Sequence, residues 1–396
     1  MKELLTVGVI GTGNCGGQLA DAASGMGFKA IAINASQDDM SNLVNPVDCF
    51  MVGDGNGTGK SREEAQRFLN ERTSLYKDER LINFILTHDI CVVTTSTGGG
   101  FGSGTSLEII KTLADMYPDK LFIPAGVLPF NAEGFTAQNH SVQWLQDLED
   151  MEISYLLYDN DRFEGRTEQE VCEKVCKDFL TDIRIMRGDF VSDTITGGID
   201  PRDLLTVYST PGRIVSAGLS GVDVDDLSEK SLVKTIKGYI DETSAHADMV
   251  DDKQILASAT MYCLPDEFDP YKGSVRADVQ DLFGSHIGDY ANFSDIGKMN
   301  ADEEPSIAIV LAGLSAPQNR IARLVKRMNK LANDITTRKQ SGSKLKGVTT
   351  DTPGLKLRSK SFGSTGVRTN ANTDHAPGKH VNNSAEEVTK KTKNNK

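Results

Sequence analysis

The chain has 396 residues, a formal net charge of −13, 38% hydrophobic residues and 25% charged residues. This length predicts two domains. The composition excludes a chain that is mostly disordered and one dominated by membrane spans. The apolar run at the N-terminus is too short for a secretion signal. We therefore expect a cytoplasmic protein that makes no membrane contact.

Cysteine is sparse, with six residues in the whole chain and no CxxC pair. This pattern argues against a disulfide framework and against a structural metal site. Cys172 and Cys176 lie four residues apart and share one face of an expected helix. Their simplest interpretation is a pair of small buried apolar residues, because free cysteine is among the most buried residue types.

The charge is distributed unevenly along the chain. Residues 337–396 carry thirteen Lys and Arg against four Asp and Glu, a net charge of +9, which leaves −22 on residues 1–336. Residues 341–396 also contain almost no large apolar side chains, so they cannot bury enough surface to fold alone. We predict a disordered basic tail there.

Short apolar runs and helical segments alternate through the first part of the chain. Continuous apolar strands joined by helices indicate a parallel sheet that is covered on both faces. We therefore predict an α/β nucleotide-binding domain at residues 1–165. Its predicted strands are residues 5–10, 30–34, 90–95, 121–127 and 153–158.

A long helix is predicted at residues 166–188, where apolar side chains such as Val171 and Phe179 recur at helical spacing. It leads to a smaller α+β domain at residues 189–315, and a last helix follows at residues 316–340 before the tail at 341–396. The strands predicted for the second domain are residues 213–218, 256–263 and 306–311, with helices near residues 228–243 and 275–283.

The first glycine-rich loop fits the pattern G-x-G-x-x-G at residues 11–16, between a strand and a helix. Such a turn places phosphate oxygens at a helix N-terminus. An NAD site also needs an acidic residue at the end of the second strand. That strand ends in Asn34, and Asp38 follows too late, so an NAD-dependent oxidoreductase remains only an alternative.

Two further glycine-rich loops follow. Residues 53–61 look like the phosphate loop G-x-x-x-x-G-K-[ST], but Asp54 stands where the first glycine is required. Residues 98–104 read GGGFGSG between a strand and a helix. So many glycines are costly in backbone entropy, and they allow backbone N–H groups to surround a polyphosphate.

The third loop resembles the GGGTGTG or GGGTGSG signature of the tubulin/FtsZ superfamily, with Phe101 where threonine is usual. The resemblance implies a Rossmann-like parallel-sheet GTPase domain, a long central helix and a smaller α+β domain. It also implies that GTP or GDP binds with Mg²⁺ held through phosphates and water. The nucleotide-binding residues that it implies are Gly11, Thr12, Gly13, Asn14, Cys15, Asn34, Gly57, Thr58, Gly59, Gly98, Gly99, Gly100, Phe101, Gly102, Ser103, Gly104, Glu133 and Asn160.

Residues 128–134 resemble the PFxxEG turn of the family, which brings in Glu133. Residues 158–163 resemble the segment whose asparagine contacts guanine, which points to Asn160. The family also stacks an aromatic side chain from the long helix on the base. Asp178 and Phe179 are the nearest candidates for this role, although Phe179 suits a core position equally well.

Residues 189–212 resemble the acid-bearing segment that reaches the nucleotide of the next subunit in FtsZ-like proteins, and most of all in the TubZ branch of plasmids and phages. Asp200 and Asp203 match its two acids, whereas Gly198 replaces its asparagine. Two carboxylates three residues apart can face one water, and the resemblance implies a catalytic role. The simpler interpretation is that Asp200 caps a helix that starts at Pro201.

The resemblance as a whole implies a GTP-hydrolysing cytoskeletal protein that polymerises head to tail, with the active site completed across the subunit interface, for segregation of plasmid or phage DNA. We expect the C-terminal helix and tail to bind a DNA-bound adaptor protein, with Phe362 in the contact, so that any nucleic-acid contact is indirect. The alternatives are a non-hydrolysing filament homologue and the NAD-dependent oxidoreductase.

Overall fold

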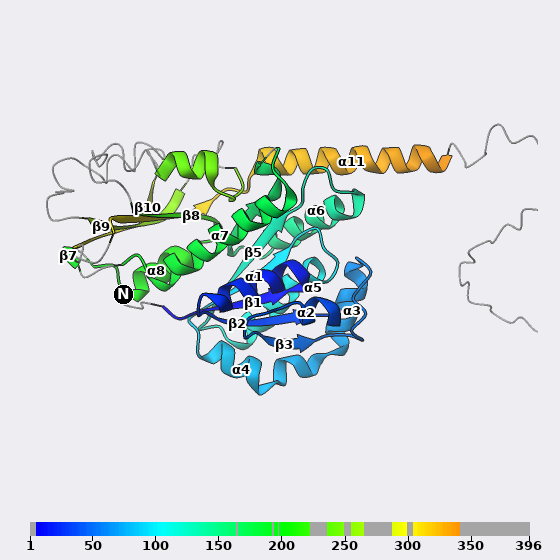
Figure 1. The fold of residues 1–396 in the computed structure, drawn as a ribbon, viewed down its shortest axis with the longest axis horizontal. Coiled ribbons are helices and arrows are strands. Elements are labelled where there is room, and N and C mark those ends of the chain that lie inside the picture. Colours follow the sequence, from blue (N-terminus) through cyan, green and yellow to red (C-terminus); the bar gives the residue numbers. More distant parts are fainter. Residues whose placement is uncertain are drawn as a thin grey trace, which may run out of the picture. The chain divides into compact units, whose positions relative to one another are not determined.

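A computed structural model describes residues 5–163, 165–191, 194–196, 198–221, 236–248, 255–264, 287–298 and 304–340. The chain divides into two compact units, residues 1–342 and 343–396, and every described residue belongs to the first. In this part an eleven-stranded sheet is flanked by helices (Figure 1). None of the helices in the described ranges is long and apolar enough to cross a bilayer. The predicted tail and the predicted helix at 275–283 lie outside the described residues.

Six parallel strands form the first part of the sheet, in the order β3-β2-β1-β4-β5-β6. The five predicted strands are confirmed, and β3 is additional. It was not predicted because it has four residues at the sheet edge, of which only Phe50 is buried. This order is also that of dinucleotide-binding sheets, so the sheet alone leaves the NAD alternative open. The bounds are β1 (Val7–Thr12), β2 (Lys29–Asn34), β3 (Asp48–Met51), β4 (Ile90–Ser96), β5 (Leu121–Leu128) and β6 (Ser154–Asp159).

Successive residues of these strands enter two separate cores, one on each face of the sheet. In β1, Val9 packs in the core that also contains residues of α1 and α7, whereas Ile10 packs in the core shared with α3, α4, α5 and α6. Because both faces are buried, the strands read as continuous apolar runs. The helices of this part are α1 (Gly13–Gly25), α2 (Gln37–Ser41), α3 (Arg62–Glu71), η1 (Thr73–Lys77), α4 (Glu79–Leu86), α5 (Phe101–Met116), α6 (Phe135–Glu149), η2 (Asn160–Arg162) and α7 (Glu168–Arg187).

The long predicted helix is α7, which begins after a capping box formed by Thr167 and Glu170 and ends at the left-handed Gly188. Its apolar stripe is buried as predicted. It also buries Asp178, whose carboxylate accepts hydrogen bonds from Ala245 N at 2.6 Å and from Tyr239 Oη at 2.7 Å. These bonds fasten α7 to the segment around η4 (Tyr239–Thr243).

The remaining strands continue the same sheet beyond β6, in the order β8-β11-β9-β10-β7. The three strands predicted for the second domain are confirmed, and two more are present. Of the helix predicted near 228–243, only residues 236–243 are described, as a short α-helical stretch that continues into the π-helical turn η4 (Tyr239–Thr243). The predicted domain boundaries at 165 and 188 stay a prediction, since one sheet crosses both. The bounds are β7 (Thr194–Thr196), α8 (Pro201–Tyr208), β8 (Gly212–Ser220), β9 (Ile255–Leu264), β10 (Ile287–Lys298) and β11 (Ser306–Leu314).

The last described helix, α11 (Gln318–Gln340), matches the predicted C-terminal helix and packs on α6. Arg320 near its start is fully buried. Its guanidinium donates to Asp159 Oδ2 at 2.8 Å and to the carbonyl oxygen of Pro129 at 2.6 Å. A single side chain of α11 therefore joins the carboxyl ends of β5 and β6.

Replacing Arg320 with Ala is expected to lower the free energy of unfolding by about 3–5 kcal/mol, because Asp159 would remain buried without its partner. Urea unfolding followed by circular dichroism measures this change. Arg323→Ala is the matched control, since Arg323 is exposed on the same helix, and it should change stability by less than about 0.5 kcal/mol. Equal effects of the two substitutions would show that the buried ion pair does not stabilise the fold.

Candidate functional site

Three glycine-rich loops meet at the carboxyl edge of the parallel strands. The loops after β1 and β4 lie side by side because these strands are paired. A Cβ atom added to Gly13 would stand 3.1 Å from Gly102 N, and one added to Gly100 would stand 2.6 Å from Lys60 Cα. The structure therefore brings together all three loops that the sequence analysis singled out.

Several of these glycines are required by the contacts of the loops with one another. A Cβ atom on Gly11 would lie 2.3 Å from Gly16 O, and one on Gly16 would lie 2.2 Å from Thr94 O. On Gly102 it would lie 2.1 Å from Thr95 Oγ1. Such distances are far shorter than any real contact of a methyl group. The glycines thus let the start of α1 and the start of α5 approach each other and the sheet.

The first turns of α1 and α5 are prepared for an anion. Neither helix has a side-chain cap or an acidic residue in its first turn, a property that α6 shares. In contrast, α2, α3, α4, α7 and α8 each have a side-chain cap and an acidic first turn. Uncapped first-turn N–H groups and the helix dipole together favour negative charge such as phosphate.

The loop before α5 is braced by side chains that sequence reasoning missed. His140 of α6 donates from Nδ1 to Gly99 O at 2.9 Å, and the Ser103 hydroxyl donates to the same carbonyl. Burial lowers the pKa of His140, so the ring is neutral at pH 7 and can hold this tautomer. A lone histidine carries no sequence signal for this role.

The second loop lies against the start of α5. Gly57 and Gly59 both have positive φ, and Gly57 N donates to Ala35 O at 2.8 Å. A Cβ atom on Gly100 would stand 2.7 Å from Thr58 Oγ1. The predicted residues Gly57, Thr58 and Gly59 are therefore placed beside the third loop, where a phosphate held by α5 would meet them.

Two of the predicted nucleotide-binding side chains make hydrogen bonds within the protein. Asn34 Oδ1 accepts from Ala35 N at 2.8 Å, and its Nδ2 donates to Asp39 Oδ2 at 3.1 Å. The Thr12 hydroxyl donates to Thr94 O at 3.0 Å. Asn34 thus shapes the turn after β2, and its predicted contact with the nucleotide stays a prediction.

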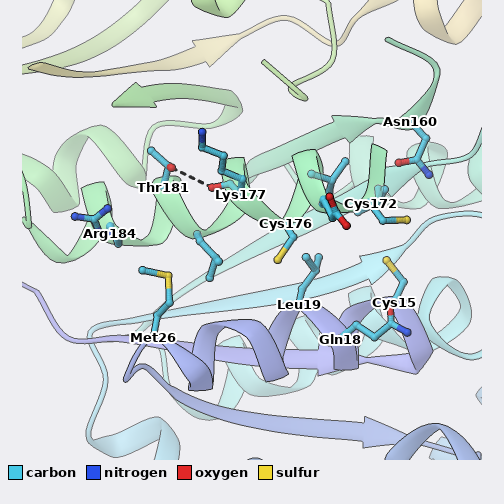
Figure 2. Close-up of a pocket in the computed structure, with 14 residues that line it drawn as sticks. Cys15, Gln18, Leu19, Met26, Asn160, Cys172, Cys176, Lys177, Thr181 and Arg184 are labelled. Atoms are coloured by element: carbon cyan, nitrogen blue, oxygen red, sulfur yellow. Dashed lines mark hydrogen bonds between the residues drawn. The ribbon is translucent and has the colours of Figure 1, made fainter. Parts of the chain in front are cut away.

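A cavity of about 580 Å³ lies between α1 and α7, next to the first loop (Figure 2). Cys15 of α1 and Asn160 of η2 stand at one end of it, and Met26 and Arg184 stand at the other. Glu133 accepts from Phe130 N at 2.9 Å, and burial raises the pKa of its carboxyl. The structure therefore places Cys15 and Asn160 at one end of the cavity, beside the uncapped first turn of α1.

The predicted stacking residues do not reach this cavity. Phe179 is fully buried and makes an edge-to-face contact with Tyr158, and Asp178 is bound to the segment near η4. The interpretation of Phe179 as a core residue is confirmed. The wall of the cavity on α7 is formed instead by residues with no aromatic ring among them, namely Cys172, Glu173, Val175, Cys176, Lys177, Leu180, Thr181 and Arg184.

Asp200 and Asp203 form a capping box at the start of α8. Asp200 Oδ1 accepts from Arg202 N at 2.7 Å and from Asp203 N at 3.0 Å, and Asp203 Oδ2 accepts from Asp200 N at 3.0 Å. Asp200 is exposed and Asp203 is half-buried. Among the described residues nothing bonds to the second oxygen of either carboxylate. Helix capping and a second role are therefore compatible.

The two acids lie at the opposite edge of the sheet from the glycine loops. The carboxyl end of α7 meets the start of the chain, where Leu5 N donates to Arg187 O, and it leads into α8. The cavity extends along α7 from Cys172 to Arg184, and its Cys172 end is the one beside the loops. With twenty residues, α7 spans about 30 Å between these ends. One chain therefore holds the loops and the acids apart.

The first part of the chain is similar to known proteins. Residues 6–167 match the family model described as "Tubulin/FtsZ family, GTPase domain". The tubulin-like protein CetZ of Pyrococcus abyssi is 26% identical over 252 residues, which cover 61% of this chain and 68% of CetZ. The tubulin-like protein TubZ of Clostridium botulinum C phage is 27% identical over 177 residues, which cover 42% of this chain and 48% of TubZ.

A solved structure extends the likeness over most of the chain. A GTPγS-form protofilament of TubZ from Bacillus thuringiensis serovar israelensis aligns with a TM-score of 0.69 at 17% identity, covering 85% of this chain and 95% of that one. The predicted tubulin/FtsZ fold is confirmed. CetZ and TubZ proteins both match, so the comparisons do not select the TubZ branch.

Proposed function

Because the chain has the tubulin/FtsZ fold and its residues 6–167 match the GTPase domain of that family, we propose that the protein binds GTP and assembles head to tail into filaments. The phosphates bind at the amino ends of α1 and α5, where Gly11–Gly16 and Gly98–Gly104 meet. Thr58 and its neighbouring glycines face the terminal phosphate. The uncapped first turns of both helices support this assignment.

The single observation that carries the filament proposal is the separation of the loops and the acids by the length of α7. In one chain the glycine loops form a loop edge and the two acids form an acid edge, at opposite ends of α7. The site is completed when the acid edge of one subunit meets the loop edge of the next. Such a contact joins two different surfaces, so it propagates into a filament. Hydrolysis then occurs at each subunit interface.

In this scheme Asp200 and Asp203 orient the water that attacks the terminal phosphate. Their free carboxylate oxygens can each accept a hydrogen bond from that water, while the capping oxygens hold the pair in place. The described residues include no group of three or more His, Cys, Asp or Glu side chains arranged to hold a metal. A magnesium ion would take its ligands from the phosphates and from water, and would offset the phosphate charge.

Light scattering at 90° with simultaneous phosphate release tests the proposal on the full chain with GTP, ATP or no nucleotide in the presence of Mg²⁺. We expect scattering to rise with GTP alone and to decay as phosphate appears. Scattering without phosphate would support the non-hydrolysing homologue. No response to either nucleotide would contradict the proposal and would favour the dinucleotide alternative.

For the cargo, we propose a DNA-bound adaptor held by α11 and the basic residues 341–396, as part of plasmid or phage DNA segregation. The similarity to a phage TubZ and the net charge of the tail support this role. Deleting residues 341–396 should leave phosphate release unchanged and abolish cosedimentation of filaments with DNA and its adaptor. Cosedimentation of the deleted chain at the full-length level would contradict the adaptor role.

A further inference from the structure

Three of the six cysteines of the chain face one cavity. Cys15 comes from the first turn of α1, and Cys172 and Cys176 come from successive turns of α7 on the opposite wall (Figure 2). All three are free thiols. The pair that looked like two buried apolar residues in the sequence thus lines an open cavity, and it does so at the end nearest the glycine loops.

The position of these thiols relative to the phosphates places them where a nucleotide base would lie. Cys15 follows Gly13 by two residues, within the uncapped first turn of α1. Asn160, whose amide can pair with a purine edge, lines the same end of the cavity. A nucleotide with its phosphates on α1 and α5 extends its base into this space, between Cys15 and the thiols of α7. This step rests on the proposed function.

The three thiols differ in their access to solvent. Cys172 is exposed, whereas Cys15 and Cys176 are half-buried against the core of the domain. Burial is the main cause that raises the pKa of each, to about 12 for Cys15. Cys172 is the residue that a reagent meets first, because it is the exposed one. Glu168 and Glu173 add to the rise of its pKa, and since the thiolate is the reactive form, its reaction should quicken as the pH rises.

The wall of the cavity on α7 carries charges of both signs. Lys177, Arg184 and Glu173 line it, and Lys177 and Glu173 are exposed. Thr181 and Gln18 add polar groups on the two walls. A low-molecular-weight disulfide that carries both carboxylates and ammonium groups can therefore place a carboxylate near Lys177 and an ammonium group near Glu173 while one of its sulfur atoms approaches Cys172.

We propose that Cys172 is a thiol-modification site whose occupancy excludes nucleotide, and whose reagent is a small anionic disulfide of the glutathione type. The Cys172 thiolate attacks one sulfur of the disulfide, and the S–S bond of the reagent breaks. The other half of the reagent leaves as a thiol, after it takes up the proton that Cys172 lost. The product is a mixed disulfide on α7. Its peptide-sized adduct fills the end of the cavity that the base needs, so modification and nucleotide binding exclude each other.

Mass spectrometry of the full chain treated with oxidised glutathione, with and without GTP, tests this proposal. Binding of GTP is measured in the same samples by equilibrium dialysis. We expect GTP at 100 times its dissociation constant to slow modification of Cys172 about 100-fold, as simple competition requires. Cys49 is the internal control, because it is a half-buried free thiol whose pKa is also raised by burial, and it lies on β3 away from the cavity.

A second measurement asks whether the adduct blocks the site. The modified chain should lose GTP binding and regain it after reduction, whereas Cys172→Ser treated in the same way should bind GTP as well as its own untreated sample. If GTP binds but Cys172 reacts equally fast in its presence, or if the adduct leaves GTP binding intact, the inference is overturned and the proposed function stands. If GTP does not bind to the untreated chain, the proposed function fails and the inference fails with it.

Discussion

Replacing Asp200 with Asn is expected to lower GTP-dependent phosphate release by about 10²–10⁴-fold, the range of a positioned acid or base, while filaments still form. The physical reason is that Asn keeps the oxygen that caps α8 but removes the negative charge that would orient water. Asn and Asp are equally good N-caps, so the helix and its presentation at the acid edge are retained. Phosphate release per polymerised subunit, with polymer measured by sedimentation, is the relevant quantity.

Two further variants separate capping from catalysis. Asp200→Ala loses the cap as well as the charge, and it should cost about 1 kcal/mol of stability in addition to the loss of hydrolysis. Asp78→Asn is the matched control, because Asp78 caps α4, another helix of eight residues, and accepts from Arg80 N in the same way. Normal hydrolysis by polymerised Asp200→Asn would show that Asp200 is only a helix cap.

The parts of the fold that could be predicted from the sequence are those whose local pattern and burial agree. The strands β1 and β4 are buried on both faces, so their apolar runs are uninterrupted, and α7 repeats its apolar residues at helical spacing. In contrast, β3 exposes three of its four residues in part. Its apolar pattern is therefore too short and too broken to distinguish a strand from a loop.

The site could be predicted to the level of its loops, because close backbone approach requires glycine and leaves a visible run such as residues 98–104. Its side chains were less predictable. His140 braces Gly99 from 41 residues away, and Arg320 reaches Asp159 across 161 residues. Such bonds arise from tertiary packing and leave no local pattern. The wall of α7 was missed because cysteines at helical spacing also fit a buried core.

Replacing Gly102 with Ala is expected to weaken nucleotide binding about 10²-fold, because the added methyl group would stand 2.1 Å from Thr95 Oγ1 and 2.6 Å from Thr12 O. The start of α5 must then move away from β1, and a displacement of about 1 Å in a positioning element can cost about 10²-fold in function. Overpacking should also cost about 1–3 kcal/mol of stability. Equilibrium dialysis with GTP and urea unfolding measure the two effects.

Gly238→Ala is the matched control for this substitution. Gly238 has helical backbone angles, and a Cβ atom there meets nothing within 4 Å. The substitution should therefore leave both GTP binding and stability close to those of the unaltered chain. If Gly102→Ala bound GTP as tightly as Gly238→Ala, the first turn of α5 would not be where the phosphates bind.

The Gly102→Ala and Asp200→Asn variants together provide the sharpest test of a site shared between subunits. The first keeps the acids and binds the nucleotide weakly, and the second keeps the nucleotide and loses an acid. A subunit interface that joins the acid edge of Gly102→Ala to the loop edge of Asp200→Asn contains every group that the site needs. Mixing two variants that are each nearly inactive should therefore restore part of the phosphate release. Hydrolysis within a single subunit predicts no recovery at any ratio of the two, since neither chain alone has both halves.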